Sequence, residues 1–225
     1  MGNYKISLNQ LAEFYNATDA GKEKIVNQQM KPNPFLIPWY QLPKARLKKS
    51  LGDNGNLDPV IDALGILKSR VPKNRRQEID RQVSIEALER FVEMQLPSIF
   101  KETEYEVIKP KRKSTIIGGV DVLVAPDLVI KSQIDGDVFY GGVKIHISKG
   151  KPFSIQQGKI VSDTILTYLT AEVIKPGEFV LPEACYCLDI FAGRIVPAKA
   201  EDHITSSEVR NICKKVKQVW DSIND

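Results

Sequence analysis

Residues 126–147, PDLVIKSQIDGDVFYGGVKIHI, decide the fold of this chain. Two apolar runs flank the dipeptide Asp135-Gly136, and an Asp-Gly pair in that position is a strong hairpin signal. A turn centred on this dipeptide pairs residues whose numbers sum to about 271, so Asp127 is expected opposite Lys144. The segment therefore predicts an antiparallel hairpin that brings a carboxylate next to a lysine at its open end.

Further helices and strands are predicted on both sides of this hairpin. Apolar residues at helical spacing behind a capping residue indicate helices, and short apolar runs indicate strands. The predicted helices cover residues 7–16, 84–96 with Ser84 as the N-cap, 154–169, and a C-terminal segment in which Thr205 and Glu208 form a capping box. The predicted strands cover residues 105–109, 115–124, 127–132 and 138–147, and a second hairpin is predicted to turn at Ala192-Gly193. This order predicts an α/β or α+β domain built on a central mixed sheet flanked by helices.

The first 83 residues differ in composition from the rest. Residues 31–43 contain the prolines Pro32, Pro34, Pro38 and Pro43 and, between them, the aromatic residues Phe35, Trp39 and Tyr40. This density of proline predicts an extended connector whose aromatic side chains pack onto the main domain, with base stacking as the alternative. Residues 44–81 carry ten basic side chains against five acidic ones. We therefore expect a helical, proline-interrupted, basic region at 1–83 and the α/β domain at 84–225.

The composition excludes several classes of protein. The chain has 225 residues, 42% hydrophobic and 27% charged, with a formal net charge of +4, which is typical of a globular protein. It has no apolar stretch of roughly 20 residues and no signal-peptide pattern at its start, so we expect a cytoplasmic protein without a membrane partner.

Cys185, Cys187 and Cys213 are expected to be reduced core thiols. Neither histidine lies in a zinc or Ser-His-Asp motif, and glycine-rich nucleotide motifs are missing. Chemistry is therefore expected to use carboxylates and lysines.

The hairpin also resembles the motif of a known family. Pro126-Asp127, followed after fourteen residues by Gly142-Val143-Lys144, resembles the pattern of the PD-(D/E)XK nuclease-like superfamily, which includes restriction-endonuclease-like and RecB-like proteins. The core of that family is a helix, a three-stranded meander, a crossing helix and a further strand, and the elements predicted from residue 84 onward are similar to it. The resemblance implies a metal-dependent nuclease that hydrolyses the phosphodiester bonds of DNA with Mg²⁺ or Mn²⁺.

The resemblance implies roles for individual residues. Asp127 would bind the metal ion, Lys144 would orient the nucleophilic water, and Gln157 would support the site from the following helix. The RecB-like branch has a tyrosine four residues after that glutamine, where this chain has Val161. The segment GGVD, which ends at Asp121, resembles the Gly-x-x-Asp of the same branch. The metal carboxylate is therefore either Asp127 or Asp121, and the hairpin register favours Asp127.

The chain departs from the family pattern at Gly142, where a second acidic residue is expected. Glycine offers no side-chain ligand, so three outcomes stay open. The second ligand comes from elsewhere, with Asp121, Glu89 and Glu93 as candidates; or metal binding is weak and cleavage is slow; or catalysis is lost and a nucleic-acid-binding or assembly protein remains on the same fold. For Glu89 and Glu93, which are four residues apart, a solvated helix face is the simpler interpretation.

Two basic clusters fit a polyanionic partner. The first consists of Lys73, Arg75 and Arg76, and the second of Lys111, Arg112 and Lys113. Clustered basic side chains neutralise phosphates and give salt-dependent binding, although such clusters also occur as solvated loops. The sequence therefore predicts nucleic acid, in the first place DNA, as the partner, and it leaves a homodimer or a protein partner open.

Overall fold

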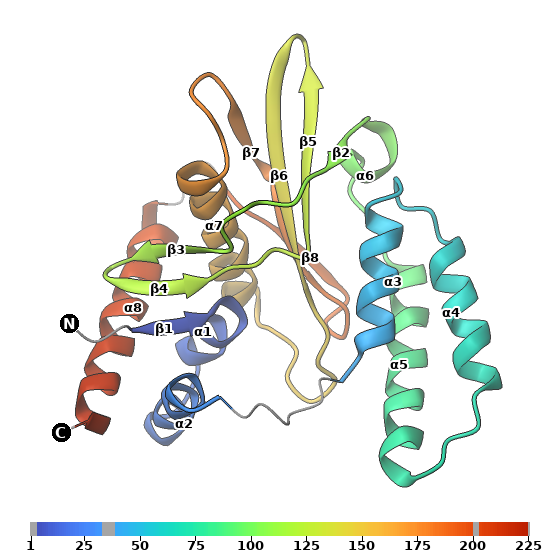
Figure 1. Ribbon diagram of the computed structural model, residues 1–225, viewed down its shortest axis with the longest axis horizontal. Coiled ribbons are helices and arrows are strands. Elements are labelled where there is room, and N and C mark those ends of the chain that lie inside the picture. The colour runs from blue at the N-terminus through green and yellow to red at the C-terminus, as the bar shows by residue number, and fades with distance from the viewer. Residues whose placement is uncertain (1–3, 33–38, 200–202, 225) are drawn as a thin grey trace.

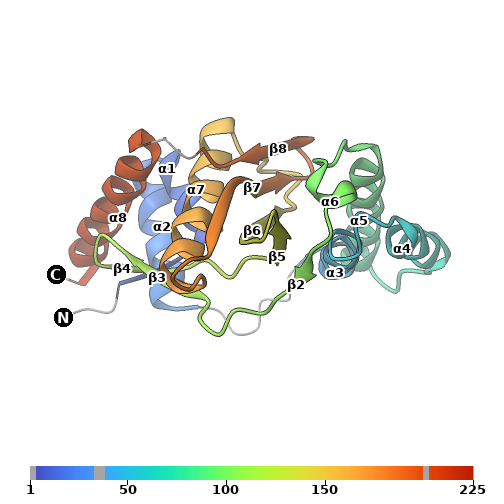
Figure 2. The ribbon, with the colours of Figure 1, turned by 90° about the horizontal axis from the view of Figure 1, so that it is seen from above.

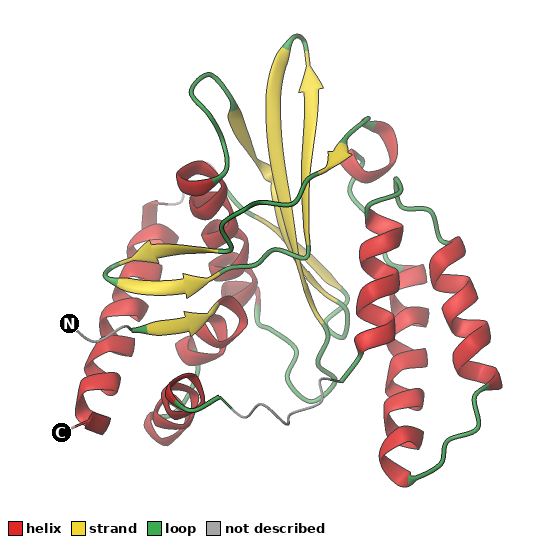
Figure 3. Ribbon diagram, in the orientation of Figure 1, coloured by secondary structure: helices red, strands yellow, loops and turns green. Residues whose placement is uncertain are grey.

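The computed structural model describes residues 4–32, 39–199 and 203–224, and it shows a mixed α/β fold (Figures 1 and 3). The helices are α1 (Leu8–Tyr15), α2 (Asp19–Met30), α3 (Gln41–Leu51), α4 (Asp58–Ser69), α5 (Arg75–Glu93), α6 (Ile99–Glu102), α7 (Ile155–Glu172) and α8 (His203–Asn224). The strands are β1 (Lys5–Ser7), β2 (Glu106–Val107), β3 (Ser114–Ile117), β4 (Val120–Leu123), β5 (Leu128–Ile134), β6 (Asp137–His146), β7 (Phe179–Asp189) and β8 (Arg194–Pro197).

A five-stranded sheet with the order β2-β5-β6-β7-β8 forms the centre of the molecule. β6 and β7 run parallel, and the other neighbouring strands run antiparallel. Parallel neighbours need a crossover connection, and α7 provides it. A second sheet has the order β1-β4-β3. Figure 2 shows α1, α7 and α8 on one side of the five-stranded sheet and α3, α4 and α5 on the other.

Two apolar cores lie on the two faces of the five-stranded sheet. Successive side chains of a strand point to opposite faces. Leu128 and Ile130 of β5 accordingly belong to the core shared with α3, α4 and α5, whereas Val129 belongs to the core shared with α1, α7 and α8. Because α1 contributes to the same core as α7, the N-terminal segment is built into the packing of the sheet.

The hairpin predicted at Asp135-Gly136 is confirmed. Leu128 pairs with Val143, so the register has the expected sum of 271. Asp135 has φ 52° and Gly136 has φ 93°, and a two-residue turn with positive φ at both positions matches the right-handed twist of the strands that it joins.

The helix predicted from Ser84 begins earlier than expected. Its N-cap is Asn74, whose side chain accepts the backbone N–H of Gln77 at 2.9 Å, and α5 then runs from Arg75. Ser84 is buried within this helix. The predicted boundary between residues 83 and 84 therefore falls inside α5.

Residues 115–124, predicted as one strand, form two. β3 and β4 pair antiparallel on either side of Gly118 and Gly119, which have φ 57° and 80°. Two glycines in this conformation reverse the chain within an apolar run. The last helix also differs, because α8 starts at His203 rather than after Thr205; the side chains of residues 203–206 lie outside the described ones.

The proline-rich connector is described only in part, since Pro34, Phe35 and Pro38 lie outside the described residues. Tyr40 packs against Phe191 with ring centroids 5.9 Å apart, so the predicted packing onto the main domain is confirmed for this ring. Trp39 is 44% exposed, and the Arg76 guanidinium lies 5.5 Å from its ring centroid.

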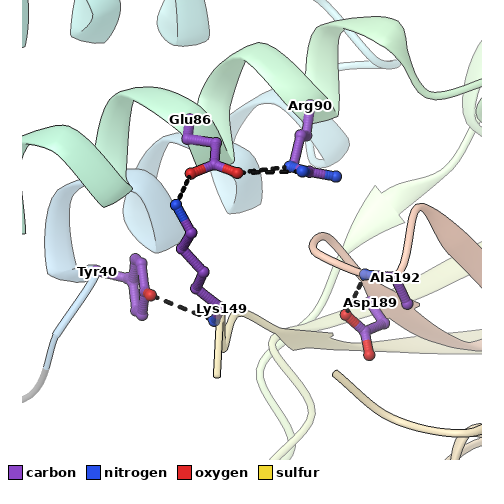
Figure 4. A network of polar contacts seen from close by, with 6 residues as sticks. All are labelled: Tyr40, Glu86, Arg90, Lys149, Asp189 and Ala192. Carbon is purple, nitrogen blue, oxygen red and sulfur yellow. Dashed lines mark hydrogen bonds and ion pairs between the residues drawn. The ribbon is translucent and has the colours of Figure 1, made fainter. Parts of the chain in front are cut away.

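A polar network ties α3 and α5 to the segment after β6 (Figure 4). Glu86 accepts a hydrogen bond from Lys149 Nζ at 2.6 Å and from two nitrogens of Arg90 at 3.1 Å. These contacts lower the pKa of Glu86, and the hydrogen bond from Lys149 has the largest effect. Tyr40 Oη accepts the backbone N–H of Lys149 at 3.4 Å. Tyr40 directly precedes α3, which carries three lysines of the site described next.

Candidate functional site

A cavity of about 660 Å³ lies at the open end of the β5–β6 hairpin, between α3, β2 and the segment that follows β2. Its lining combines apolar residues with six cationic side chains. The cationic side chains are Lys48, Lys49, Lys109, Arg112, Lys113 and Lys144. Among the described residues, Asp127 is the one carboxylate in the lining. This excess of positive charge in a concave site favours anionic ligands.

Asp127 is bound through both of its carboxylate oxygens. Oδ2 accepts the backbone N–H of Ile145 at 2.9 Å, just beyond the last backbone pair of the hairpin. Oδ1 lies 3.1 Å from Lys44 Nζ and 3.9 Å from Lys48 Nζ. These two lysines are four residues apart on α3, so they share a helix face. The side chain of Asp127 is only 8% exposed, and its charge is balanced within the protein.

The Lys144 ammonium group is held against the segment before β5. Nζ donates hydrogen bonds to the carbonyl of Val124 at 3.0 Å and of Ala125 at 2.7 Å. Burial lowers the pKa of Lys144 to about 8; the Asp127 carboxylate opposes this shift in part, and the two lysines of α3 add to it. The predicted proximity of Asp127 and Lys144 is therefore seen, and both groups make polar contacts within the protein.

The lowered pKa of Lys144 predicts a pH-dependent stability. The unfolded chain holds this proton up to a pKa of 10.5, whereas the folded protein releases it near pH 8. The unfolded state thus binds more protons in this window, so the free energy of unfolding rises with pH there, by up to about 3 kcal/mol. We expect Lys144→Met to lose the rise, measured by urea unfolding of both proteins between about pH 7 and 10. Identical pH profiles of the two proteins would contradict this expectation.

Gly142 faces the core beneath α7. A Cβ atom at this position would lie 2.8 Å from Ile165 Cγ2 and 3.3 Å from Leu169 Cδ1. Interiors are close-packed, so a side chain here requires Ile165, Leu169 or α7 itself to shift. Helix–sheet packing thus explains why residue 142 is a glycine.

The other predicted metal ligands do not meet Asp127. Asp121 lies on β4 in the three-stranded sheet. Glu93 ends α5 and lines a separate cavity, and Glu89 pairs with Lys68 at 3.0 Å. Within the described ranges, no group of three His, Cys, Asp or Glu side chains is placed to hold a metal ion. One carboxylate that already binds two lysines does not fit Mg²⁺ or Mn²⁺, which prefer several free oxygen ligands.

The structure places Gln157 away from this cavity. Its Oε1 accepts the backbone N–H of Ser154 at 2.9 Å, and Ser154 Oγ accepts the backbone N–H of Gln157 at 3.2 Å, which is a capping box at the start of α7. Its Nε2 donates to the carbonyl of Ala12 at 2.9 Å. Gln157 lines a different cavity, beside α1 and α2. The Ser-x-x-Gln spacing is the sequence signal for this structural role.

The two predicted basic clusters lie in different places. Arg112 and Lys113 line the cavity, and Lys111 precedes them on the same segment. Lys73, Arg75 and Arg76 lie at the start of α5. Of these, Arg75 binds Glu78 at 3.0 Å and Arg76 stacks on Trp39.

The lysines of α3 are the site residues that the sequence does not single out. Lys44 and Lys48 bind Asp127, while Lys49 lines the cavity. The spacing of Lys44 and Lys48 indicates a common helix face. It does not indicate what that face contacts, because this depends on the packing of α3 against a strand far along the chain.

Comparisons with known proteins do not identify a family. A scan against protein-family models found no match to this chain, and neither did a search of the curated proteins. Among the described helices, none combines the length and the apolar character needed to cross a bilayer. The function is therefore inferred from the geometry of the site.

Proposed function

We propose that this protein binds DNA through the cavity at the open end of the β5–β6 hairpin and that it does not cut the strand with a metal ion. One observation carries the proposal: six cationic side chains line the cavity, while its carboxylate, Asp127, is already bound by Lys44, Lys48 and a backbone N–H. Lysine and arginine that neutralise phosphates supply most of the affinity in sequence-independent DNA binding.

The fold supports a relation to restriction-endonuclease-like proteins. α5, the antiparallel strands β2, β5 and β6, the crossing helix α7 and β7, which is parallel to β6, resemble the order of elements in that core, but β3 and β4 of the second sheet are inserted between β2 and β5. On this proposal, the chain keeps the Pro-Asp pair and the lysine of the nuclease pattern as parts of an anion-binding site. At the position of the second acidic residue the chain has Gly142, which packs closely beneath α7.

The rim of the cavity is suited to phosphate contacts. Lys49, Lys109 and Lys113 are exposed, and within the part of the chain that the structure describes they form no ion pair. Arg112, in contrast, binds Glu172 at 2.7 Å. An exposed lysine without an acidic partner breaks no ion pair when it binds a phosphate. These three lysines are therefore expected to contribute most of the binding.

The test compares binding and cleavage in the wild type and in Asp127→Asn. We expect a short fluorescent duplex to bind in EDTA, and added Mg²⁺ to weaken the binding by competing for the phosphates, as measured by anisotropy. Asp127→Asn should bind at least as tightly as the wild type, because it removes a negative charge from an anion site, and its amide oxygen can still accept the N–H of Ile145. Cleavage by the wild type in Mg²⁺ or Mn²⁺ that Asp127→Asn abolishes would contradict the proposal and support the metal-dependent nuclease instead.

A further inference from the structure

We propose that Lys144 is a carbonyl-reactive amine, which forms an imine with an aldehyde that also carries a phosphate group. The neutral Nζ attacks the aldehyde carbon, and a carbon–nitrogen bond forms. The carbonyl oxygen leaves as water with the two protons that the amine gives up, so no oxidant or reductant is needed. The inference rests on the proposed function in one respect, because the cavity proposed to bind the phosphates of DNA also binds the phosphate group of the aldehyde.

The position of Lys144 carries this inference. Its side chain lines the cavity and is mostly buried, while Nζ is held at a fixed place by the carbonyls of Val124 and Ala125. An amine that is held in place in the wall of a cavity is positioned for attack on a carbonyl group bound there. The rim lysines Lys49 and Lys109 line the same cavity but are exposed to solvent.

Burial is the main factor that favours the neutral form of Lys144. Lys44 and Lys48 lie on the facing side of α3, close enough to bind the carboxylate of Asp127, and the Cys187 thiol faces it from β7. Burial, helped by Lys44 and Lys48, lowers the pKa of Lys144 from 10.5 to about 8, although the Asp127 carboxylate and, more weakly, Cys187 oppose this shift. Its neutral fraction near neutral pH is therefore roughly a hundredfold larger than that of a surface lysine.

The rim of the cavity fits the phosphate of such a ligand. Lys49, Lys109 and Lys113 surround a volume of about 660 Å³, which is within the usual range for small-molecule sites. Two sources share this chemistry. One is a small phosphorylated aldehyde; the other is an abasic site in DNA, where the ring-opened sugar carries an aldehyde between two phosphates.

The first experiment uses pyridoxal 5′-phosphate as the small probe, with borohydride to reduce the imine and peptide mass spectrometry to map the adduct. We expect Lys144 to be labelled about tenfold more than any surface lysine, such as Lys214 or Lys215 on α8, because of its larger neutral fraction. Inorganic phosphate should reduce the labelling. Labelling of Lys144 at the level of the α8 lysines in the wild-type protein would overturn the inference, whatever the variants do.

The second experiment traps the protein on a duplex that contains one abasic site. A borohydride-stable adduct at Lys144 supports the inference and identifies DNA as the source, whereas an adduct only with pyridoxal 5′-phosphate supports it with a small molecule as the source. Lys144→Arg, which keeps the charge but forms no imine, should lose both adducts, while Lys214→Met, at an exposed position of α8 outside the cavity, should keep them. If neither probe modifies Lys144 although the wild type binds intact duplex DNA, the inference fails and the proposed function stands; if the wild type binds no DNA, the proposed function fails.

Discussion

Removal of three lysines from the cavity rim, in the variant Lys49→Ala/Lys109→Ala/Lys113→Ala, is expected to weaken binding to duplex DNA by roughly a hundredfold or more at about 0.1 M salt. Each lysine that neutralises a phosphate releases a condensed cation from the DNA. The logarithm of the affinity therefore falls more steeply with salt as more lysines make contact. We expect the slope of this plot to become shallower by about one for each lysine removed, measured by anisotropy at several salt concentrations.

A second triple variant controls for the loss of net charge. Lys24→Ala/Lys214→Ala/Lys215→Ala removes the same charge from exposed positions on α2 and α8, away from the cavity. Its affinity is expected to stay within about threefold of the wild type, because exposed charges separated by more than a Debye length are largely screened. An equal loss of affinity in both triple variants would show that the DNA is attracted by the overall charge and not by this cavity.

Introducing the acidic residue of the nuclease pattern, by Gly142→Asp, is expected to lower the free energy of unfolding by about 3 kcal/mol or more. Overpacking against Ile165 and Leu169 accounts for about 1–3 kcal/mol of the loss, and burial of a carboxylate without a partner adds to it. Urea unfolding measures the change. This variant is also expected to gain no metal-dependent cleavage, because one added carboxylate does not release Asp127 from Lys44 and Lys48.

Two alanine variants separate packing from charge. Gly142→Ala adds only the Cβ atom that would meet Ile165 and should cost about 1–3 kcal/mol. Gly65→Ala on α4, where an added Cβ meets no atom within 4 Å, should be neutral or stabilise the helix by up to about 1 kcal/mol. A Gly142→Asp protein with wild-type stability that cuts DNA in Mg²⁺ would show that our explanation of this glycine is wrong.

The central hairpin was accessible from the sequence because its determinants are local. The Asp135-Gly136 turn fixes the register, and the period of two then assigns each side chain to a face of the sheet. The β3–β4 hairpin was missed although Gly118-Gly119 is a two-residue turn signal, because the apolar runs on either side of it together match the pattern of one continuous strand. The start of α5 was missed because its first turns are charged and exposed, so they show no apolar period before the buried part of the helix begins.

The site was predictable only where short segments of the sequence determine it. The neighbourhood of Asp127 and Lys144 follows from the hairpin register, which is set within a short segment. The ion pairs of Asp127 with Lys44 and Lys48 join residues about eighty positions apart in the sequence, and the packing of α3 determines them. The sequence alone therefore indicated a carboxylate available to a metal ion, whereas the structure shows one that two lysines already neutralise.

The salt dependence of DNA binding by the wild-type protein in EDTA tests the central claim most directly. The account predicts binding without a divalent metal ion, with an affinity whose logarithm falls linearly with the logarithm of the salt concentration at a slope of about −3 or steeper, as expected when three or more phosphates are neutralised. An affinity that does not change with salt, or binding that appears only when Mg²⁺ or Mn²⁺ is added, would contradict it.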